Sequence, residues 1–411
     1  MSQRTGKADL PLHGGQVPPW LANRMTALGR VMAEAIVHHY GRDEFLRRLA
    51  HPFWFQSFGA VMGMDWHSSG ITTSVIGALK RGLQPLQREL GIYVCGGRGR
   101  HSRQTPQELM SIGERTGLDA QRLVRTSRLV AKVDSAAVQD GYELYLHAFF
   151  VTSEGKWCVV QQGMNTALRE ARRYHWLSEN VGSFLDSPHA AIEGPASKGN
   201  IINLADERAA RNRRAELELV RAGPSQALAT LRQLRNAGNA ALSLFPELEA
   251  SPAGVLPHLK MPAHHDVRAS DVELKRLHGV LSAVADRVPA DFCDLLLSPG
   301  VGQRTLTALA LVAEVLHGAP ARFSDPARFS IAHGGKDGHP FPVPLKVYDE
   351  TIKVLTSAVS QAKLGNADKL SAIQRLDRQA RLLEGNASGP SFDQFMKAER
   401  MRSASYGGRK V

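Results

Sequence analysis

Apolar positions in the first third of the chain recur at the spacing of amphipathic helices. A helix is predicted to open at Pro18–Trp20, with an apolar face formed by Met25, Leu28, Met32, Ile36 and Val37. The segment Asp43–Leu49 then leads into an aromatic run that we expect in the core: Phe53, Trp54, Phe55 and Phe58. Two further helices are predicted between Thr105 and Lys132, the first with Thr105 as N-cap and Pro106 at its first position.

The pattern then changes to that of β-strands. Tyr142–Val151 and Lys156–Gln162 are rich in aromatic and β-branched residues and flank a turn at Glu154-Gly155. This pattern predicts a β-hairpin, and a turn of two residues would place His147 opposite Gln162. Residues 1–190 are therefore expected to form an α+β domain that carries the active site.

The second part of the chain is predicted to be helical. Helical periodicity runs through Asp206–Gly223, Ala227–Ala241, Asp271–Val288 and Val347–Leu364. The expected fold class is an α+β N-terminal domain followed by an all-α C-terminal domain over residues 191–365 that includes a helix-hairpin-helix unit. Residues 366–411 are expected to add a basic helix and a mobile tail.

The segment Asp294–His317 carries that unit. A short apolar helix end, Leu295–Leu297, is followed by the tight loop Pro299–Gly302 and by a second helix with an apolar face. Glycines in the loop permit close approach of a ligand, and amides at the start of the second helix are free to meet a phosphate oxygen. The residues expected to hold a nucleic-acid backbone here are Gly300, Val301, Gly302, Gln303, Arg304 and Thr305. The alternative is a turn between two packed helices.

The charge balance favours a polyanionic partner. The chain has 51 Lys and Arg against 39 Asp and Glu, a net charge of +12, which attracts nucleic acid without regard to fold. A predicted helix carries four basic residues within about a third of its circumference: Arg122, Arg125, Arg128 and Lys132. This face is expected either to contact phosphates or to be a solvated helix face. Glycine-rich loops add Arg98, Arg100, Arg103 and Lys336. The expected partner is single-stranded or structured DNA, with RNA as an alternative.

The sequence also predicts a cytoplasmic, soluble protein. We find no uninterrupted apolar stretch long enough to cross a bilayer, and the polar start MSQRTGKADL lacks the apolar core of a secretory signal. Cys95, Cys158 and Cys293 form no CxxC pair, so neither a disulfide framework nor a thiolate zinc site is indicated.

Carboxylates and histidines in the first part suggest metal-dependent phosphodiester cleavage. Such chemistry uses one or two divalent cations to activate water and to stabilise the leaving oxygen. The predicted ligands of Mg²⁺ or Mn²⁺ are Asp65, His67 and Asp134. Glu143 and His147, expected on one face of a strand, complete the predicted catalytic set together with Gln162. Either Gln161 or Gln162 would orient water or phosphate. The alternatives are helix capping for Asp65 and packing for His67.

The hairpin segment also resembles the corresponding part of helix-hairpin-helix DNA glycosylases. In those enzymes a Gly-x-Pro sequence ends the second helix and a catalytic Asp follows, and here Gly318-Ala319-Pro320 precedes Asp325. The resemblance implies a base-excision role for Asp325. Arg304 stands where the lyase-type members have a nucleophilic lysine, and an arginine forms no Schiff base. Ser324-Asp325-Pro326 is typical of a helix N-cap followed by proline, and we favour this interpretation of Asp325.

Across most of its length the chain resembles the prokaryotic domain-of-unknown-function family 763. The resemblance is carried by Asp9–Gly15, Val17–Leu21, Asp65–Gly70, Val159–Asn165 and Ala332–Gly338. It implies a DNA-processing or nuclease-like role. The sequence as a whole therefore predicts a metal-dependent nuclease acting on structured or single-stranded DNA, with a base-excision enzyme and a non-catalytic DNA-structure binding protein as the alternatives.

Overall fold

The computed structural model describes residues 19–62, 64, 70–168, 170–194, 199–237 and 274–327, together with 353–355, 357, 359, 360 and 372. Most of the predicted helix Val347–Leu364 and nearly all of the predicted tail 366–411 lie outside these residues. So do Asp65, His67 and Lys336 from the predicted sites.

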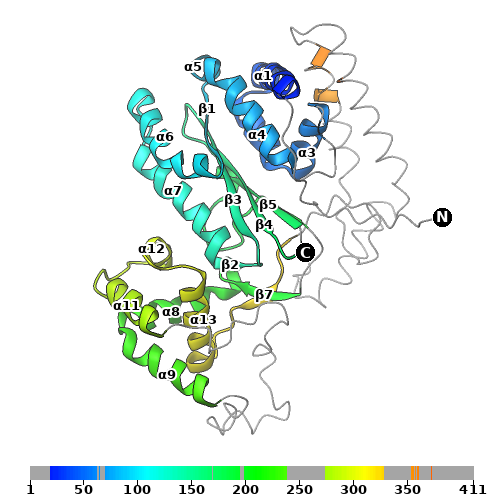
Figure 1. Ribbon diagram of the computed structural model, residues 1–411. Helices are drawn as coiled ribbons and strands as arrows, with labels where there is room; N and C mark the ends of the chain where they lie inside the picture. Colours follow the sequence, from blue (N-terminus) through cyan, green and yellow to red (C-terminus); the bar gives the residue numbers. More distant parts are fainter. Residues whose placement is uncertain are drawn as a thin grey trace, which may run out of the picture.

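A five-stranded antiparallel sheet forms the centre of the described fold (Figure 1), in the order β1-β3-β4-β5-β6. Its strands are β1 (Ile92–Arg98), β3 (Glu143–Thr152), β4 (Trp157–Asn165), β5 (Glu170–Leu177) and β6 (Ala191–Glu193). Successive side chains of a strand point to opposite faces. Phe150 and Val160 accordingly join one buried apolar cluster, and Phe149 and Val159 join another. The sheet is therefore covered on both faces.

The first face is covered by the N-terminal helices, which are α1 (Pro19–Tyr40), α2 (Arg42–Ala50), α3 (Pro52–Val61), α4 (Gly70–Leu83) and the short α5 (Gln87–Leu90). The predicted apolar face of α1 is confirmed, because Met25, Met32 and Ile36 are buried in this core. The predicted aromatic run is confirmed as a core element as well, since Phe53, Trp54, Phe55 and Phe58 are all buried.

The second face is covered by α6 (Arg100–Thr116) and α7 (Ala120–Lys132). The predicted start of α6 was wrong, since the helix begins at Arg100 and Pro106 lies inside it. Proline has no N–H to offer the carbonyl one turn earlier, that of Ser102. The Thr105 hydroxyl donates to this Ser102 oxygen at 2.8 Å, so the acceptor is satisfied and the helix continues.

The predicted β-hairpin is present as β3 and β4, but its register differs by one residue. Thr152 N donates to Lys156 O at 2.8 Å, which leaves a three-residue loop with Gly155 at φ 83°. A glycine in the left-handed region at the end of such a loop is a common hairpin connection. His147 therefore lies opposite Gln161, and the prediction of Gln162 as its partner was wrong.

The prediction of an all-α C-terminal domain was also wrong. The part of the chain after residue 190 contributes the strands β7 (Asn200–Asn203) and β8 (Arg322–Ser324). They pair with β2 (Val138–Gln139) from the first part in a three-stranded sheet of order β2-β7-β8. The helices of this part pack mainly on one another, and α12 also packs on α7: α8 (Ala210–Arg221), α9 (Pro224–Ala237), α11 (Leu274–Ala285), α12 (Phe292–Leu297) and α13 (Gln303–His317). Strand pairing thus joins segments that the sequence assigns to separate domains.

Gly96 in β1 occupies a position that no other residue fits. Its φ is +81°, and an added Cβ would lie 2.2 Å from the backbone oxygen of His147. We predict that Gly96→Ala lowers the free energy of unfolding by about 2–3 kcal/mol, because left-handed strain and a backbone clash add together. Urea unfolding followed by circular dichroism measures this loss. The matched control is Gly117→Ala, where φ is +76° and an added Cβ meets nothing within 4 Å; an equal loss in both variants would contradict the clash.

Candidate nucleic-acid interface

The segment predicted as a helix-hairpin-helix unit contains two helices, α12 and α13, joined by a short loop. Asp291 caps α12 by accepting from Asp294 N at 2.8 Å, and Val301 N donates to Ser298 O at 3.2 Å across the loop. Val301 is buried, whereas Gly300 is exposed with φ 83°. The loop is therefore anchored by the valine and bends at the glycine.

The first turn of α13 is open to an incoming acceptor. The cap residue Gly302 has no side chain to accept from the amides of that turn, and the first amides of any helix have no partner within it. Gln303 and Arg304 are exposed, whereas Thr305 is buried. The loop and this first turn thus carry exposed side chains, among them one guanidinium, next to amides that lack a partner within the helix.

The basic face of α7 packs beside this hairpin. Arg125 Nη2 pairs with Asp294 Oδ1 at 2.7 Å, and Lys132 Nζ donates to the carbonyl oxygen of Val301 in the loop. Burial lowers the pKa of Lys132. Arg122 and Arg128 on the same face are exposed. Two of the four predicted cations therefore hold α7 to the hairpin, and the other two are exposed next to them.

The three arginines assigned to a glycine-rich loop have a different local structure. Arg98 ends β1, Arg100 begins α6, and Gly99 between them has φ 59°; Arg103 lies one turn into the helix. All three are exposed. The three residues 117–119 connect α6 to α7, so the two helices run antiparallel and the start of α6 lies toward the end of α7 that carries Lys132.

The predicted metal ligand Asp134 is a buried hydrogen-bond acceptor. It lies in a π-helical turn, Val133–Ala137, that follows α7 and is 1% exposed. Its carboxylate accepts from Trp176 Nε1 at 2.9 Å, from Gln161 Nε2 and from His189 Nε2. Both oxygens face N–H donors, so a cation would meet hydrogens where it needs lone pairs.

His147 belongs to the same buried network, through Gln161. Its Nδ1 lies 2.7 Å from Gln161 Oε1 and its Nε2 lies 2.9 Å from Ser127 Oγ. Burial lowers the pKa of His147, which favours the neutral ring. The polar chain from Ser127 to Asp134 thus ties α7, β3 and β4 together inside the core.

Glu143 and Gln162 lie apart from this network. Glu143 is exposed at the start of β3, and an irregularity of the β3–β4 register between Leu144 and Leu146 breaks the alternation that was expected to place it on the face of His147. Gln162 donates to Tyr145 Oη at 2.6 Å on the opposite face of β4 from Gln161. Within the described residues no group of three His, Cys, Asp or Glu side chains is placed to hold a metal ion.

Asp325 is held in a buried ion cluster. Its two oxygens accept from Arg172 Nη1 and Nη2 at 2.8 and 2.7 Å, and Oδ1 also accepts from Ala327 N at 3.0 Å. Arg172 Nη1 also reaches Asp140 Oδ2 at 3.0 Å. The contact with Ala327 N closes an Asx turn, and the bidentate pair fastens the residue after β8 to β5.

Several members of the buried network were missed in the sequence. Gln161 was considered only beside Gln162, and Trp176, His189 and Ser127 were assigned no role. The length of the hairpin loop was the signal that could have identified Gln161, because a three-residue loop sets the register that places Gln161 opposite His147. Nothing local indicates His189, which reaches Asp134 from 55 residues away.

None of the helices described here has the length and apolar character required to span a membrane.

Comparisons with known proteins identify only the family to which the chain belongs. No curated protein and no solved structure matches the chain. A family model described as "Protein of unknown function (DUF763)" matches residues 6–343. Because this match covers most of the 411 residues, the chain belongs to the DUF763 family.

Proposed function

We propose that this protein binds the sugar-phosphate backbone of nucleic acid, with DNA as its expected partner, through the α12–α13 hairpin and the basic face of α7. The observation that carries the proposal is the docking of α7 on the hairpin. The contacts from Arg125 to Asp294 and from Lys132 to Val301 hold a row of cations beside the loop and the first turn of α13. The two predicted phosphate-binding features therefore form one surface.

The charges on this surface support the proposal. Arg122, Arg128 and Arg304 are exposed and have no carboxylate partner among the described residues. An added Cβ at Gly302 would meet nothing within 4 Å, so this glycine leaves room for a phosphate beside the loop, and the dipole of α13 favours an anion at its first turn. Backbone contacts of this kind carry no sequence information, so binding should be independent of base sequence.

The test measures binding of fluorescein-labelled single-stranded and duplex DNA by anisotropy over a series of KCl concentrations. We predict that the triple variant Arg122→Gln, Arg128→Gln, Arg304→Gln binds more weakly than the original protein. The slope of log K against log salt should become shallower by about 0.9 for each lost contact to duplex DNA and about 0.7 for single strands.

A matched triple variant removes the same charge from the other side of the sheet: Arg30→Gln, Arg81→Gln and Arg88→Gln. These arginines are exposed on α1, α4 and α5. The three substitutions should leave both the affinity for DNA and the salt slope nearly unchanged. Equal losses in the two triple variants would mean that net charge alone attracts DNA, and the proposed surface would be wrong.

A further inference from the structure

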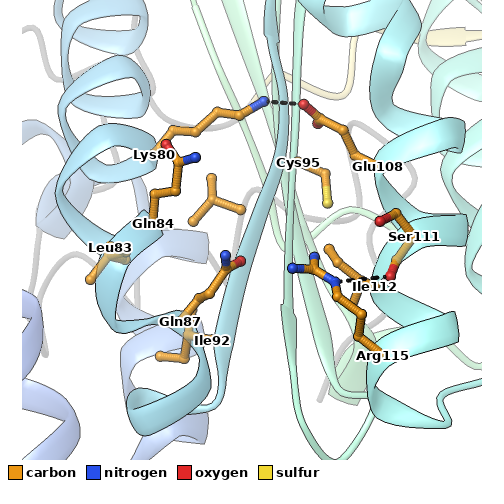
Figure 2. A pocket seen from close by; sticks show the side chains of 11 residues that line it. Lys80, Leu83, Gln84, Gln87, Ile92, Cys95, Glu108, Ser111, Ile112 and Arg115 are labelled. Carbon is orange, nitrogen blue, oxygen red and sulfur yellow. Dashed lines mark hydrogen bonds and ion pairs between the residues drawn. The ribbon is translucent and has the colours of Figure 1, made fainter.

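The outer edge of β1 lies at the bottom of a groove between two helices. β1 is the last strand of its sheet, and on the side away from β3 it faces a pocket of about 250 Å³. In Figure 2, α4 flanks the strand on one side and α6 on the other, and side chains from both point into the space between them. The pocket is independent of the proposed nucleic-acid surface.

Backbone groups of β1 point into this groove. Gly91 O accepts from Ser153 N at 2.9 Å, so Gly91 faces the neighbouring strand β3. Gly96 N instead donates to Glu108 Oε2 at 2.6 Å on the outer side. Because orientation alternates along a strand, the N–H and C=O of Ile92 and Val94 also point outward. Within the described part of the chain, the outward N–H and C=O of Val94 make no hydrogen bond, and this residue is half-buried.

One end of the open edge is closed by an ion pair. Lys80 Nζ lies 2.6 Å from Glu108 Oε1 and donates to Gly96 O at 2.8 Å. Together with the bond from Gly96 N to Glu108, this bridge satisfies both backbone groups of Gly96 from α4 and α6. An added strand therefore ends at Gly96. Ile92 is fully buried, so the accessible part of this edge centres on Val94 and ends at the bridge. At about 3.3 Å per residue, it pairs with a segment of about two or three residues.

The rest of the groove supplies one unpaired cation and apolar walls. Arg115 Nε donates to Ser111 O at 3.0 Å, and its guanidinium has no carboxylate partner among the described residues. Gln84 and Gln87 project from the opposite side (Figure 2). Leu83 and Ile112 line the two walls. This combination of a free strand edge, apolar walls and a positive charge matches an extended peptide with an acidic side chain.

We propose that this groove binds a short, extended acidic peptide as an added strand on β1. The main chain of the peptide pairs with Val94, one carboxylate meets Arg115, and alternate side chains pack against Leu83 and Ile112. Edge strands are common sites of such pairing because their outward backbone groups lack partners. The bridge between Lys80 and Glu108 fixes where the peptide ends.

The test uses a fluorescein-labelled peptide, Val-Glu-Val-Glu-Val with its C-terminus amidated, and the full chain, with binding followed by anisotropy. Two further peptides carry a backbone N-methyl group at adjacent central positions. Strand pairing requires that one of them loses about tenfold in affinity and that the other binds as before, because only alternate N–H groups face β1. Loss in both peptides, or in neither, would overturn the proposal.

Protein variants test the same contacts from the other side. Val94→Pro removes the outward N–H and should weaken binding about tenfold, whereas Val94→Ala keeps it and should change affinity less than twofold. Arg115→Gln should reduce the preference for this peptide over its Lys-containing counterpart, and Arg115→Lys should retain it. Free glutamate that competes as well as the unlabelled peptide would identify an anion pocket, and the strand-addition proposal would be wrong.

Discussion

Replacing Arg172 by Met is expected to lower the free energy of unfolding by about 3–5 kcal/mol. Arg172 is fully buried between Asp140 and Asp325, and it holds both carboxylates at 2.7 to 3.0 Å. Methionine fills a similar volume but leaves two buried carboxylates without a cation. Urea unfolding measures the loss. The matched control is Arg47→Met, which breaks an exposed pair with Glu179 and should cost less than about 1 kcal/mol.

The loss in Arg172→Met should depend on pH. Burial raises the pKa of Asp140, and the charge of Arg172 opposes that rise. Without the arginine, the pKa of this carboxyl in the folded state rises further above its value in the unfolded chain. A group of this kind stabilises the fold at low pH, and that contribution is lost as the pH rises through the folded-state pKa. The variant should therefore be least destabilised in acid, and equal losses at pH 5 and pH 8 would contradict this account.

This cluster shows why the sequence predicted only part of the fold. Helix α1 and the hairpin of β3 and β4 follow from local periodicity, which needs no information about distant residues. The strands β7 and β8 are four and three residues long, too short for alternation to be visible. They exist because they pair with segments far along the chain, and Asp325 reaches an arginine 153 residues away. Local patterns therefore predict helices and strands, whereas the role of Asp325 in the buried ion cluster depends on a residue far away in the sequence.

At the candidate interface, too, local patterns predicted the elements but not the contacts between residues that are far apart in the sequence. Gly300, Val301 and Arg304 were predicted from the spacing of a short loop between two helices, and the loop has the expected bend and anchor. The cations of α7 were predicted from their angular positions on a helix. The sequence did not indicate that Arg125 and Lys132 are used in holding α7 to the hairpin, because each of these contacts spans 169 residues.

Replacing Asp134 by Ala is expected to lower the free energy of unfolding by about 3–4 kcal/mol. Trp176, Gln161 and His189 would each lose a buried acceptor, and an unsatisfied buried donor costs about 1–3 kcal/mol. The matched control, Asp134→Asn, keeps the shape and one acceptor oxygen, so its loss should be clearly smaller. Chemical denaturation of the two variants under identical conditions measures the difference.

The same pair of variants separates a structural carboxylate from a metal ligand. If Asp134 held Mg²⁺ or Mn²⁺, adding either ion would raise the melting temperature of the original protein and leave Asp134→Asn unaffected, because binding to the folded state alone stabilises it. We expect the two proteins to respond to the ions equally, since both Asp134 oxygens already face N–H donors. An ion-dependent rise confined to the original protein would mean that the buried network opens to admit a cation, and it would return Asp134 to the catalytic role that its place in the sequence first suggested.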